Sequence, residues 1–444
     1  MIDHKSIIKS KIDNKSIVFA VFGVGYVGIP LAQAISNAGC KVIGFDIDED
    51  RVDKLNSSIS PIKQIKDEEI EEMILNGFEA TTDFSRTSDC DFLIICVPTP
   101  LSLHREPDLT AIRATMQSIQ PYLKPGQGLA LESTTWPGTT NEVLKPYIVD
   151  RGLSIGEDFF LVYSPEREDP GNVDFDTKSV PKIVAGMTAV CSEVGVAAYQ
   201  KIVNSIVPVS STQTAEMVKL VENIHRSVNI GLVNELKKIC DAMAIDIFDV
   251  IDAAATKPFG FTPYYPGPGI GGHCIPIDPF YLTWKAREYG VNTRFIELAG
   301  EINAEMPKYV VDKLSMSLNA RGKALSKSSV LCVGIAYKRD VDDMRESPSV
   351  TVMELLKASG AHVEYSDPNV PKFPKMRTHK FDLVSVELTA DNIERFDAIV
   401  LLTDHTELDY ELMRKHAALI VDTRGKYRSS ADPDNLSGAN IVRA

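Results

Sequence analysis

"SIVFAVFGVGYVGIPLAQAISNAGCKVIGFDIDEDRVDKLN", residues 16–56, contains in order an apolar run of strand length, a glycine turn, an amphipathic helix pattern and a second strand. This order predicts a βαβ unit. Its turn is a GxGxxG formed by Gly23, Gly25 and Gly28, which directly follows a strand and opens a helix. Glycines at these positions permit a tight turn, close approach of the backbone to a pyrophosphate and close helix packing. Because amide groups at the helix start would face the phosphates, we predict a dinucleotide site.

The acidic residue that ends the second strand indicates which dinucleotide binds. Asp46 lies 18 residues beyond Gly28, where a carboxylate can accept both ribose hydroxyls of an adenosine. That carboxylate would repel a 2′-phosphate, so NAD is favoured over NADP. Arg51 leaves an alternative open, since a nearby arginine can accommodate the 2′-phosphate of NADP. Arg51 is otherwise a solvated charge or a lid over the adenine.

Length and composition limit the classes of protein that remain. A chain of 444 residues corresponds to about three domains. The net charge of −14 argues against a nucleic-acid-binding surface spread over the whole molecule. Seven widely spaced cysteines, without a CxxC pair, indicate neither a disulfide framework nor a metal site, and a reducing cytoplasm fits best. No apolar run predicts a membrane span, and the N-terminal residues lack the apolar core of a signal peptide.

Polar residues follow three further strands that the sequence predicts. Residues 90–100 and 128–140 carry Thr99 and Thr134 just after an apolar run, and residues 159–172 carry Glu166 and Arg167. In open parallel sheets, ligands lie against the carboxyl ends of the strands. We therefore assign Thr99 to the cofactor site and expect Thr134 to contact nicotinamide or substrate, with capping of the next helix as its alternative role.

Residues 212–243 predict one long helix, because apolar residues recur at helical spacing without a proline. Lys219, Asn223 and Arg226 fall on one face, so a cation and a carboxamide can converge on one oxygen. A solvated polar stripe is the alternative. A helix of this length suits a connector between domains and a subunit interface.

The pattern of strand and helix returns after residue 318 and predicts a second α/β domain. This part has no GxGxxG, so a second dinucleotide is not expected. Lys338, Arg345 and Arg424 lie at or beyond predicted strand ends, where phosphate would be held. The polar chain ends, including residues 426–444, are expected to be loose.

One loop contains a cysteine in an unusual setting. In "YYPGPGIGGHCIPIDPFYL", residues 264–282, glycines and prolines lead into Cys274, and Asp278 follows four residues later. The glycines would let a substrate approach closely, and the helix that follows would lower the pKa of the thiol. Oxidation of an aldehyde to an acid needs a tetrahedral adduct, which a thiolate forms readily. Asp278 would then act as a base through water. By itself, Cys274 is equally compatible with a small buried apolar residue.

Four segments in order resemble the signatures of the nucleotide-sugar dehydrogenase family, the UDP-glucose and GDP-mannose dehydrogenases: "GVGYVGIPLA", "ENIHRSVNIGLVNELKKICDAM", "GPGIGGHCIPIDPFYL" and "AYKRDVDDMRESPS". The resemblance implies an α/β protein with two Rossmann-like parallel-sheet domains joined by a central helical region with one long helix. Residues 1–208 would bind NAD, residues 209–318 would dimerise and carry the catalytic loop, and residues 319–444 would bind the UDP-sugar. The family oxidises the C6 alcohol of the sugar to a carboxylate with two NAD.

The resemblance also implies roles for single residues. Cys274 matches the family nucleophile and Asp278 its companion acid or base. Lys219 and Asn223 match the groups that hold the C6 oxygen, where Lys219 would stabilise the oxyanion and Asn223 orient it.

Other matching positions place substrate and cofactor. Glu166 and Thr134 match positions that place water and substrate, and Glu166 is a second candidate base. The implied ligand contacts are Gly23, Gly25, Gly28, Asp46, Arg51 and Arg345 for NAD, and Lys338 and Arg424 for the UDP-sugar.

Two departures from the glucose-specific pattern bear on the sugar. Lys257 and Pro258 stand where UDP-glucose dehydrogenases have an arginine that reaches a neighbouring subunit's substrate, and Arg167 replaces an apolar residue. These segments resemble the branch that oxidises UDP-N-acetylglucosamine, and Arg167 would donate to the acetamido carbonyl. UDP-N-acetylmannosamine and UDP-glucose remain alternatives. So do a single-oxidation dehydrogenase related to the 6-phosphogluconate and hydroxyisobutyrate enzymes, and a non-catalytic NAD-responsive binding protein.

Overall fold

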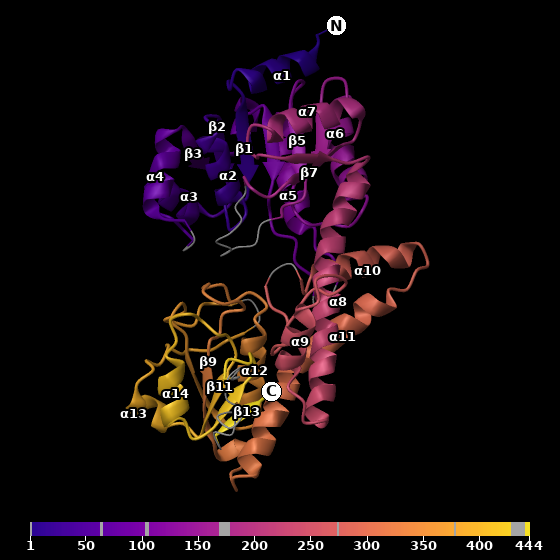
Figure 1. Ribbon diagram of the computed structural model, residues 1–444. Coiled ribbons are helices and arrows are strands. Elements are labelled where there is room, and N and C mark those ends of the chain that lie inside the picture. The colour runs from indigo at the N-terminus through magenta and orange to yellow at the C-terminus, as the bar shows by residue number, and fades with distance from the viewer. Residues whose placement is uncertain are drawn as a thin grey trace. The chain divides into compact units, whose positions relative to one another are not determined.

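The computed structural model describes residues 2–62, 65–102, 106–167, 178–272, 275–376, 379–427 and 440–444. The chain forms two compact units. The first unit comprises Met1–Glu222 and Phe280–Val291, and the second comprises Asn223–Pro279 and Asn292–Ala444. Figure 1 traces both units along the chain, and each is considered by itself below.

The first unit is built on an eight-stranded sheet with the order β3-β2-β1-β4-β5-β6-β7-β8. Neighbouring strands are parallel, except that β6 and β7 pair antiparallel. The strands are β1 (Val18–Phe22), β2 (Lys41–Phe45), β3 (Phe78–Thr81), β4 (Phe92–Ile95), β5 (Gly128–Leu131), β6 (Phe160–Tyr163), β7 (Lys182–Gly186) and β8 (Ile206–Pro208). The central strands are nearly uninterrupted apolar runs because helices cover both faces of such a sheet.

Helices of the first unit bury the apolar faces that their sequences present. They are α1 (His4–Asp13), α2 (Gly28–Asn37), α3 (Glu49–Asn56), α4 (Asp67–Leu75), α5 (Thr110–Ile119), α6 (Lys145–Asp150) and α7 (Ala189–Tyr199). Short turns are η1 (Phe84–Asp89), η2 (Gln120–Tyr122) and the π-helical η3 (Thr140–Leu144). Helix α1, at the N-terminal end in Figure 1, packs against α7 and buries Ile8 and Ile12. The expectation that the N-terminal end is loose is therefore wrong for α1.

Two helices contain boundaries between the compact units. Helix α8 (Thr212–Ala242) confirms the long helix that residues 212–243 predict. Helix α10 (Asp278–Glu288) begins at Asp278, as the sequence after the glycine loop predicts.

The second unit contains a five-stranded parallel sheet with the order β10-β9-β11-β12-β13. Its strands are β9 (Ser329–Val333), β10 (His362–Ser366), β11 (Ala398–Leu401), β12 (Ile420–Asp422) and β13 (Ile441–Arg443). Its other elements are α9 (Ile247–Ala255), α11 (Arg294–Asn319), η4 (Leu325–Lys327), α12 (Pro348–Ala358), α13 (Ala390–Glu394) and α14 (Tyr410–His416). The second α/β domain is thus confirmed.

The C-terminal residues differ from the expectation that they are loose. Strand β13 pairs with β12 along Ile441–Arg443, and the Arg443 guanidinium contacts the Asp246 carboxylate. A three-residue strand is too short to produce a visible alternation in the sequence, so its pairing partner decides it.

Candidate active site

The glycine turn after β1 has a different constraint at each glycine. Gly23 has a φ of +91°, which other residues rarely adopt, and a Cβ at Gly28 would overlap the Gly23 carbonyl oxygen. A Cβ at Gly25 would have no atom within 4 Å, so the backbone is open on that side. Helix α2 begins here without a side-chain cap. The open backbone and the uncapped amides fit the pyrophosphate of a dinucleotide.

Asp46 lies at the end of β2 beside this turn and is buried. Its Oδ2 accepts from the Val24 amide at 3.1 Å, and from Arg51 Nη1 at 3.0 Å. The Asp48 amide donates to its Oδ1. Arg51 is therefore paired with the carboxylate that we predict to bind the ribose, and this pairing competes with a role in binding a 2′-phosphate.

Thr99 and Thr134 follow the carboxyl ends of β4 and β5, as predicted. Thr99 is buried, whereas Thr134 is half-buried. The two strand ends are tied together, because the Ser133 hydroxyl donates to the Val97 carbonyl at 2.6 Å. Thr134 therefore lies on a loop whose first residue is anchored to the neighbouring strand end.

Glu166 follows β6 and pairs with Lys219 of α8. Lys219 Nζ lies 3.3 Å from Glu166 Oε2 and donates to the Glu166 carbonyl at 2.5 Å. Both side chains are largely shielded, with 7% and 12% of their surface exposed. The structure thus brings together an ammonium and a carboxylate that the sequence places 53 residues apart.

Arg167 has partners within the protein. Its Nη2 and Nε donate to the Glu222 carboxylate at 2.6 and 3.3 Å, and its Nη1 donates to the Pro181 carbonyl at 2.5 Å. Residues 166 and 167 are therefore both held by α8, through Lys219 and Glu222. The contact of Arg167 with an acetamido group stays a prediction.

Asn223 and Asp278 form the polar pair of the second unit. Asn223 Nδ2 donates to Asp278 Oδ2 at 2.5 Å, and Arg226 Nη2 donates to Asn223 Oδ1 at 3.2 Å. Asn223 and Asp278 are 4% and 1% exposed. Because Arg226 occupies the amide oxygen, the Asn223 nitrogen is oriented toward Asp278.

Cys274 and the neighbouring His273 lie outside the described residues, but the loop before them is described. A Cβ at Gly267 would lie 2.7 Å from Arg424 Nη1, and one at Gly272 would lie 2.9 Å from Tyr337 Cε2. We expected these glycines to admit a substrate. Gly272 also has a φ of +86°, which favours glycine, whereas the atom near Gly267 is the end of the flexible Arg424 side chain. Close approach of a substrate to these glycines stays a prediction.

Two arginines of the C-terminal α/β region, Arg345 and Arg424, contact the glycine loop before Cys274. The Gly272 amide donates to the Arg345 carbonyl at 3.0 Å, while the Arg345 guanidinium pairs with Asp343. Arg424 donates through Nε to the Leu402 carbonyl, and burial lowers the pKa of its guanidinium to about 10. Arg424 therefore remains a cation at neutral pH. Lys338 follows β9 and is half-buried.

Pattern analysis of the sequence missed a buried carboxylate on α8. Glu216 accepts hydrogen bonds from the amides of Gly138 and Thr140 and from the Thr140 hydroxyl. Its position three residues before Lys219, on the same face of the helix, was the available signal.

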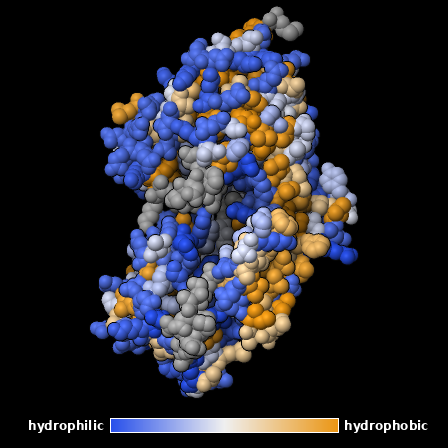
Figure 2. Space-filling view, viewed as in Figure 1, coloured by the Kyte–Doolittle hydropathy of each residue, from blue (hydrophilic) through white to orange (hydrophobic). Residues whose placement is uncertain are grey.

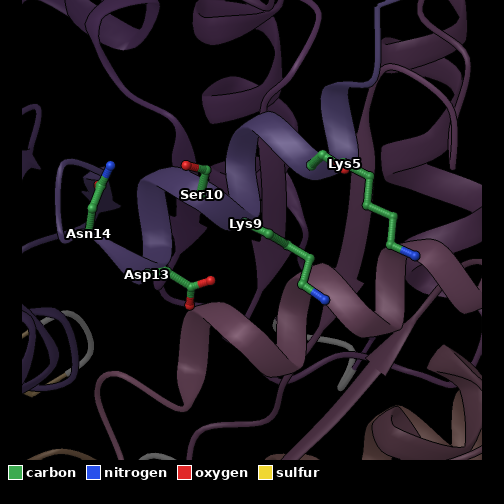
Figure 3. Close-up of a pocket in the computed structure, with 6 residues that line it drawn as sticks. Lys5, Lys9, Ser10, Asp13 and Asn14 are labelled. Carbon is green, nitrogen blue, oxygen red and sulfur yellow. The ribbon is translucent and has the colours of Figure 1, made fainter.

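A surface cavity of about 610 Å³ lies elsewhere on the first unit, along α1. Lys5 and Lys9 extend from the helix in the same direction (Figure 3) and pair with Glu193 of α7. None of the predicted site residues lines it.

The described part of the chain contains no group of three or more side chains suited to hold a metal ion. Among the described helices, none has the length and apolar character needed to cross a bilayer.

Family models match successive parts of the chain. Residues 17–231 match the NAD binding domain of the UDP-glucose/GDP-mannose dehydrogenase family, residues 213–305 match its central domain, and residues 331–429 match its UDP binding domain.

Individual relatives match over most of their length. UDP-N-acetyl-D-glucosamine 6-dehydrogenase of Pseudomonas aeruginosa is 34% identical over 395 residues, covering 88% of this chain and 92% of that protein. UDP-N-acetyl-D-mannosamine dehydrogenase of Methanococcus maripaludis is 34% identical over 390 residues, covering 87% and 85%. The solved UDP-N-acetylmannosamine dehydrogenase of Pyrococcus horikoshii superposes with a TM-score of 0.84 at 29% identity, covering 96% of this chain and 99% of that one. With three consecutive family domains and relatives of this extent, the chain belongs to the UDP-glucose/GDP-mannose dehydrogenase family and is an NAD-dependent nucleotide-sugar dehydrogenase.

Proposed function

We propose that this protein oxidises the C6 hydroxyl of a UDP-N-acetylhexosamine to the carboxylate, with UDP-N-acetylglucosamine as the preferred substrate. The observation that carries the proposal is the pairing of Asn223 with Asp278, a buried carboxylate four residues after Cys274. A carboxylate at this spacing from a thiol suits the second half of a four-electron oxidation, in which an acyl adduct must be hydrolysed.

The chemistry divides into two oxidations and a hydrolysis. NAD supplies the hydride acceptor in both oxidations, and two are reduced for each sugar. The C6 alcohol loses a hydride and a proton to give an aldehyde, which the Cys274 thiolate attacks to form a thiohemiacetal. Loss of a second hydride and a proton leaves a thioester on Cys274. Water then releases the carboxylate and restores the thiol.

Four other residues would act on the oxygen atoms of the substrate. Lys219 would stabilise negative charge on the C6 oxygen, and Asn223 would orient that oxygen. Asp278 would take the proton from alcohol or water, and Glu166 is a second candidate base. Lys219 and Glu166 hold each other in place, which limits the entropy lost when substrate binds.

Thr134 and the remaining predicted contacts would bind the rest of the two ligands. Thr134 would contact the nicotinamide or the sugar beside Glu166. Thr99, Asp46 and the glycine turn would hold NAD, with Arg345 reaching toward it. Lys338 and Arg424 would hold the UDP-sugar through its charged diphosphate. We place three functional parts at 1–208, 209–318 and 319–444. The family models match three parts in the same order, at 17–231, 213–305 and 331–429.

The choice of sugar depends on the C2 substituent. Two relatives, one named for UDP-N-acetylglucosamine and one for UDP-N-acetylmannosamine, both match at 34% identity. These relatives therefore support an acetamido group at C2 of the sugar, but they do not distinguish its two configurations. We expect kcat/KM for UDP-N-acetylglucosamine to exceed that for UDP-glucose by about tenfold to a hundredfold, because an empty acetamido pocket loses contacts and positioning.

Comparing kcat/KM for the three sugars at one pH and saturating NAD tests the choice. A preference for UDP-glucose would reject the branch, and a preference for UDP-N-acetylmannosamine would reject only the configuration at C2. Absence of turnover with all three sugars would reject both the UDP-N-acetylhexosamines and UDP-glucose as substrates.

We also propose that the protein is a homodimer. Leu232, Ile239 and Met243 are 51%, 48% and 63% exposed and lie on one face of α8 and its end. Figure 2 shows hydrophobic residues gathered along the helical side of the second unit. We take a second copy of the same chain as the occupant of this exposed apolar face, because most soluble oligomers pair identical surfaces about a two-fold axis. Light scattering of the wild type and of Leu232→Arg should give a dimer and a monomer.

We further propose that the reaction takes place in the cytoplasm. A thiol nucleophile functions in a reducing compartment, and the widely spaced cysteines of the chain do not suggest a disulfide framework. Within the described ranges, six cysteines are free thiols, which fits this proposal.

A further inference from the structure

Glu216 is a fully buried carboxylate on α8 that the proposed chemistry does not use. Its Oε2 accepts from the Gly138 amide at 2.5 Å. Its Oε1 accepts from the Thr140 amide at 2.8 Å and from the Thr140 hydroxyl at 2.7 Å. Burial raises the pKa of Glu216 to about 7 despite these three donors. A group that is so costly to bury is expected to have a specific role.

The Gly138 amide belongs to the end of a loop, and the other two donors belong to Thr140, the first residue of η3. Residues 132–139 connect β5 to η3 and include Thr134 near the strand end. The Ser133 hydroxyl fixes the start of this loop to β4's end, and Glu216 fixes its end to α8. Thr134 is therefore held from both sides.

The helix that receives the loop also carries Lys219, less than one turn beyond Glu216. Lys219 in turn holds Glu166 on the loop after β6. Two side chains of α8, three residues apart, thus fix the loops after two neighbouring strands. A displacement at Glu216 would move Thr134 relative to Lys219.

The middle of the loop provides a spectroscopic reporter. Trp136 packs against Trp284 of α10 with ring centroids 4.8 Å apart and an interplanar angle of 44°, and it donates to the Glu142 carboxylate. These are the two tryptophans of the chain. Trp136 is 7% exposed, so movement of the loop would open it to solvent.

We propose that Glu216 is a positioning residue of the active site, which holds the loop of Thr134 against the helix of Lys219. This inference rests on the proposed function for its kinetic consequence, whereas its structural consequence is independent of any substrate.

Glu216→Gln is the first test, because an amide keeps the size of the side chain but turns one acceptor into a donor that faces a backbone amide. We expect kcat with UDP-N-acetylglucosamine to fall about tenfold to a hundredfold, since small displacements of reacting groups have effects of this size. The KM for the sugar should change less than about threefold, because no contact with substrate is removed. Acrylamide quenching of tryptophan fluorescence, measured without ligands, should increase.

Thr140→Val is the second test and removes only the hydroxyl that donates to Glu216. It should produce smaller changes in the same direction. The double variant should match Glu216→Gln within about twofold, because both changes act on one interaction. Glu235→Gln, an exposed carboxylate on the same helix, should leave quenching and kcat unchanged.

Unchanged quenching and kcat in Glu216→Gln would overturn the inference, as would a double variant whose effect is the product of the single effects. If Glu216→Gln does not fold, Thr140→Val decides by the same two measurements. A wild type inactive on all nucleotide sugars would reject the proposed function, but the quenching comparison would still test the loop.

Discussion

Asn223 donates its amide proton to the Asp278 carboxylate over 2.5 Å, and both side chains are buried. This hydrogen bond fixes the orientation of the Asp278 carboxylate. Asn223 would therefore prepare the base before substrate arrives. The pairing leads to a prediction about exchanging the amide for an acid.

Asn223→Asp should place two carboxylates within hydrogen-bond distance, so that one of them must hold a proton near neutral pH. We expect kcat at pH 7 to fall by about tenfold to a hundredfold and the acid limb of the pH profile to move to higher pH. A profile of kcat against pH for wild type and variant measures this. If the acid limb of the profile lies at the same pH in both proteins, protonation of Asp278 does not control kcat, and the proposed role of Asp278 as the base would be rejected.

Cys274→Ser should abolish net carboxylate formation while NAD still binds, because a hydroxyl is a much weaker nucleophile than a thiolate at neutral pH. The loss should be roughly three orders of magnitude or more. Steady-state absorbance at 340 nm, with NAD binding followed by calorimetry, tests both statements. Full conversion to the uronic acid by this variant would reject the thioester mechanism.

Two NADH should form for each sugar acid, because an alcohol reaches the acid level through two hydride transfers. The ratio can be measured by following NADH to completion with limiting UDP-sugar and quantifying the acid by mass spectrometry. One NADH together with free aldehyde would instead indicate a single-oxidation dehydrogenase.

Asp46→Ala should weaken NAD binding by about 1–3 kcal/mol, since ribose hydroxyls lose their acceptor. It should also release Arg51, whose guanidinium is paired with Asp46 in the structure. The ratio of NAD affinity to NADP affinity should therefore fall in Asp46→Ala. Adding Arg51→Ala should raise this ratio again in part, because it removes the cation that could bind the 2′-phosphate. Titration of both nucleotides against the three proteins tests this; equal NAD affinity in wild type and Asp46→Ala would contradict the assignment.

Glu216 should make unfolding depend on pH. Burial raises its pKa from an ordinary 4.5 to about 7 in the folded protein, so the folded state binds the proton more tightly. Stability should therefore fall as pH rises from about 4.5 to about 7 and then level off, by roughly 3 kcal/mol in total for this group. Urea unfolding of wild type and Glu216→Gln at pH 5 and pH 8 measures the difference. If the free energy of unfolding changes equally with pH in both proteins, Glu216 does not contribute to the pH dependence of stability.

Much of the fold follows from local patterns in the sequence. The glycine turn of residues 23–28 and the helix α8 were predictable because tight turns and helical periodicity depend on neighbouring residues. The sequence motifs also predicted Lys219, Asn223 and Asp278 as site residues. In the structure Lys219 pairs with Glu166, and Asn223 pairs with Asp278.

Other features were decided by contacts between distant segments. The sequence could not show that Arg167 pairs with Glu222, because a charged residue after a strand end has many possible partners. It also could not show that Gly267 and Gly272 accommodate Arg424 and Tyr337, since a glycine carries no information about which neighbour excludes its Cβ. Glu216 was hidden for a related reason: a carboxylate can be buried only when donors from another segment meet it, and the donors at Gly138 and Thr140 are backbone amides that any sequence supplies.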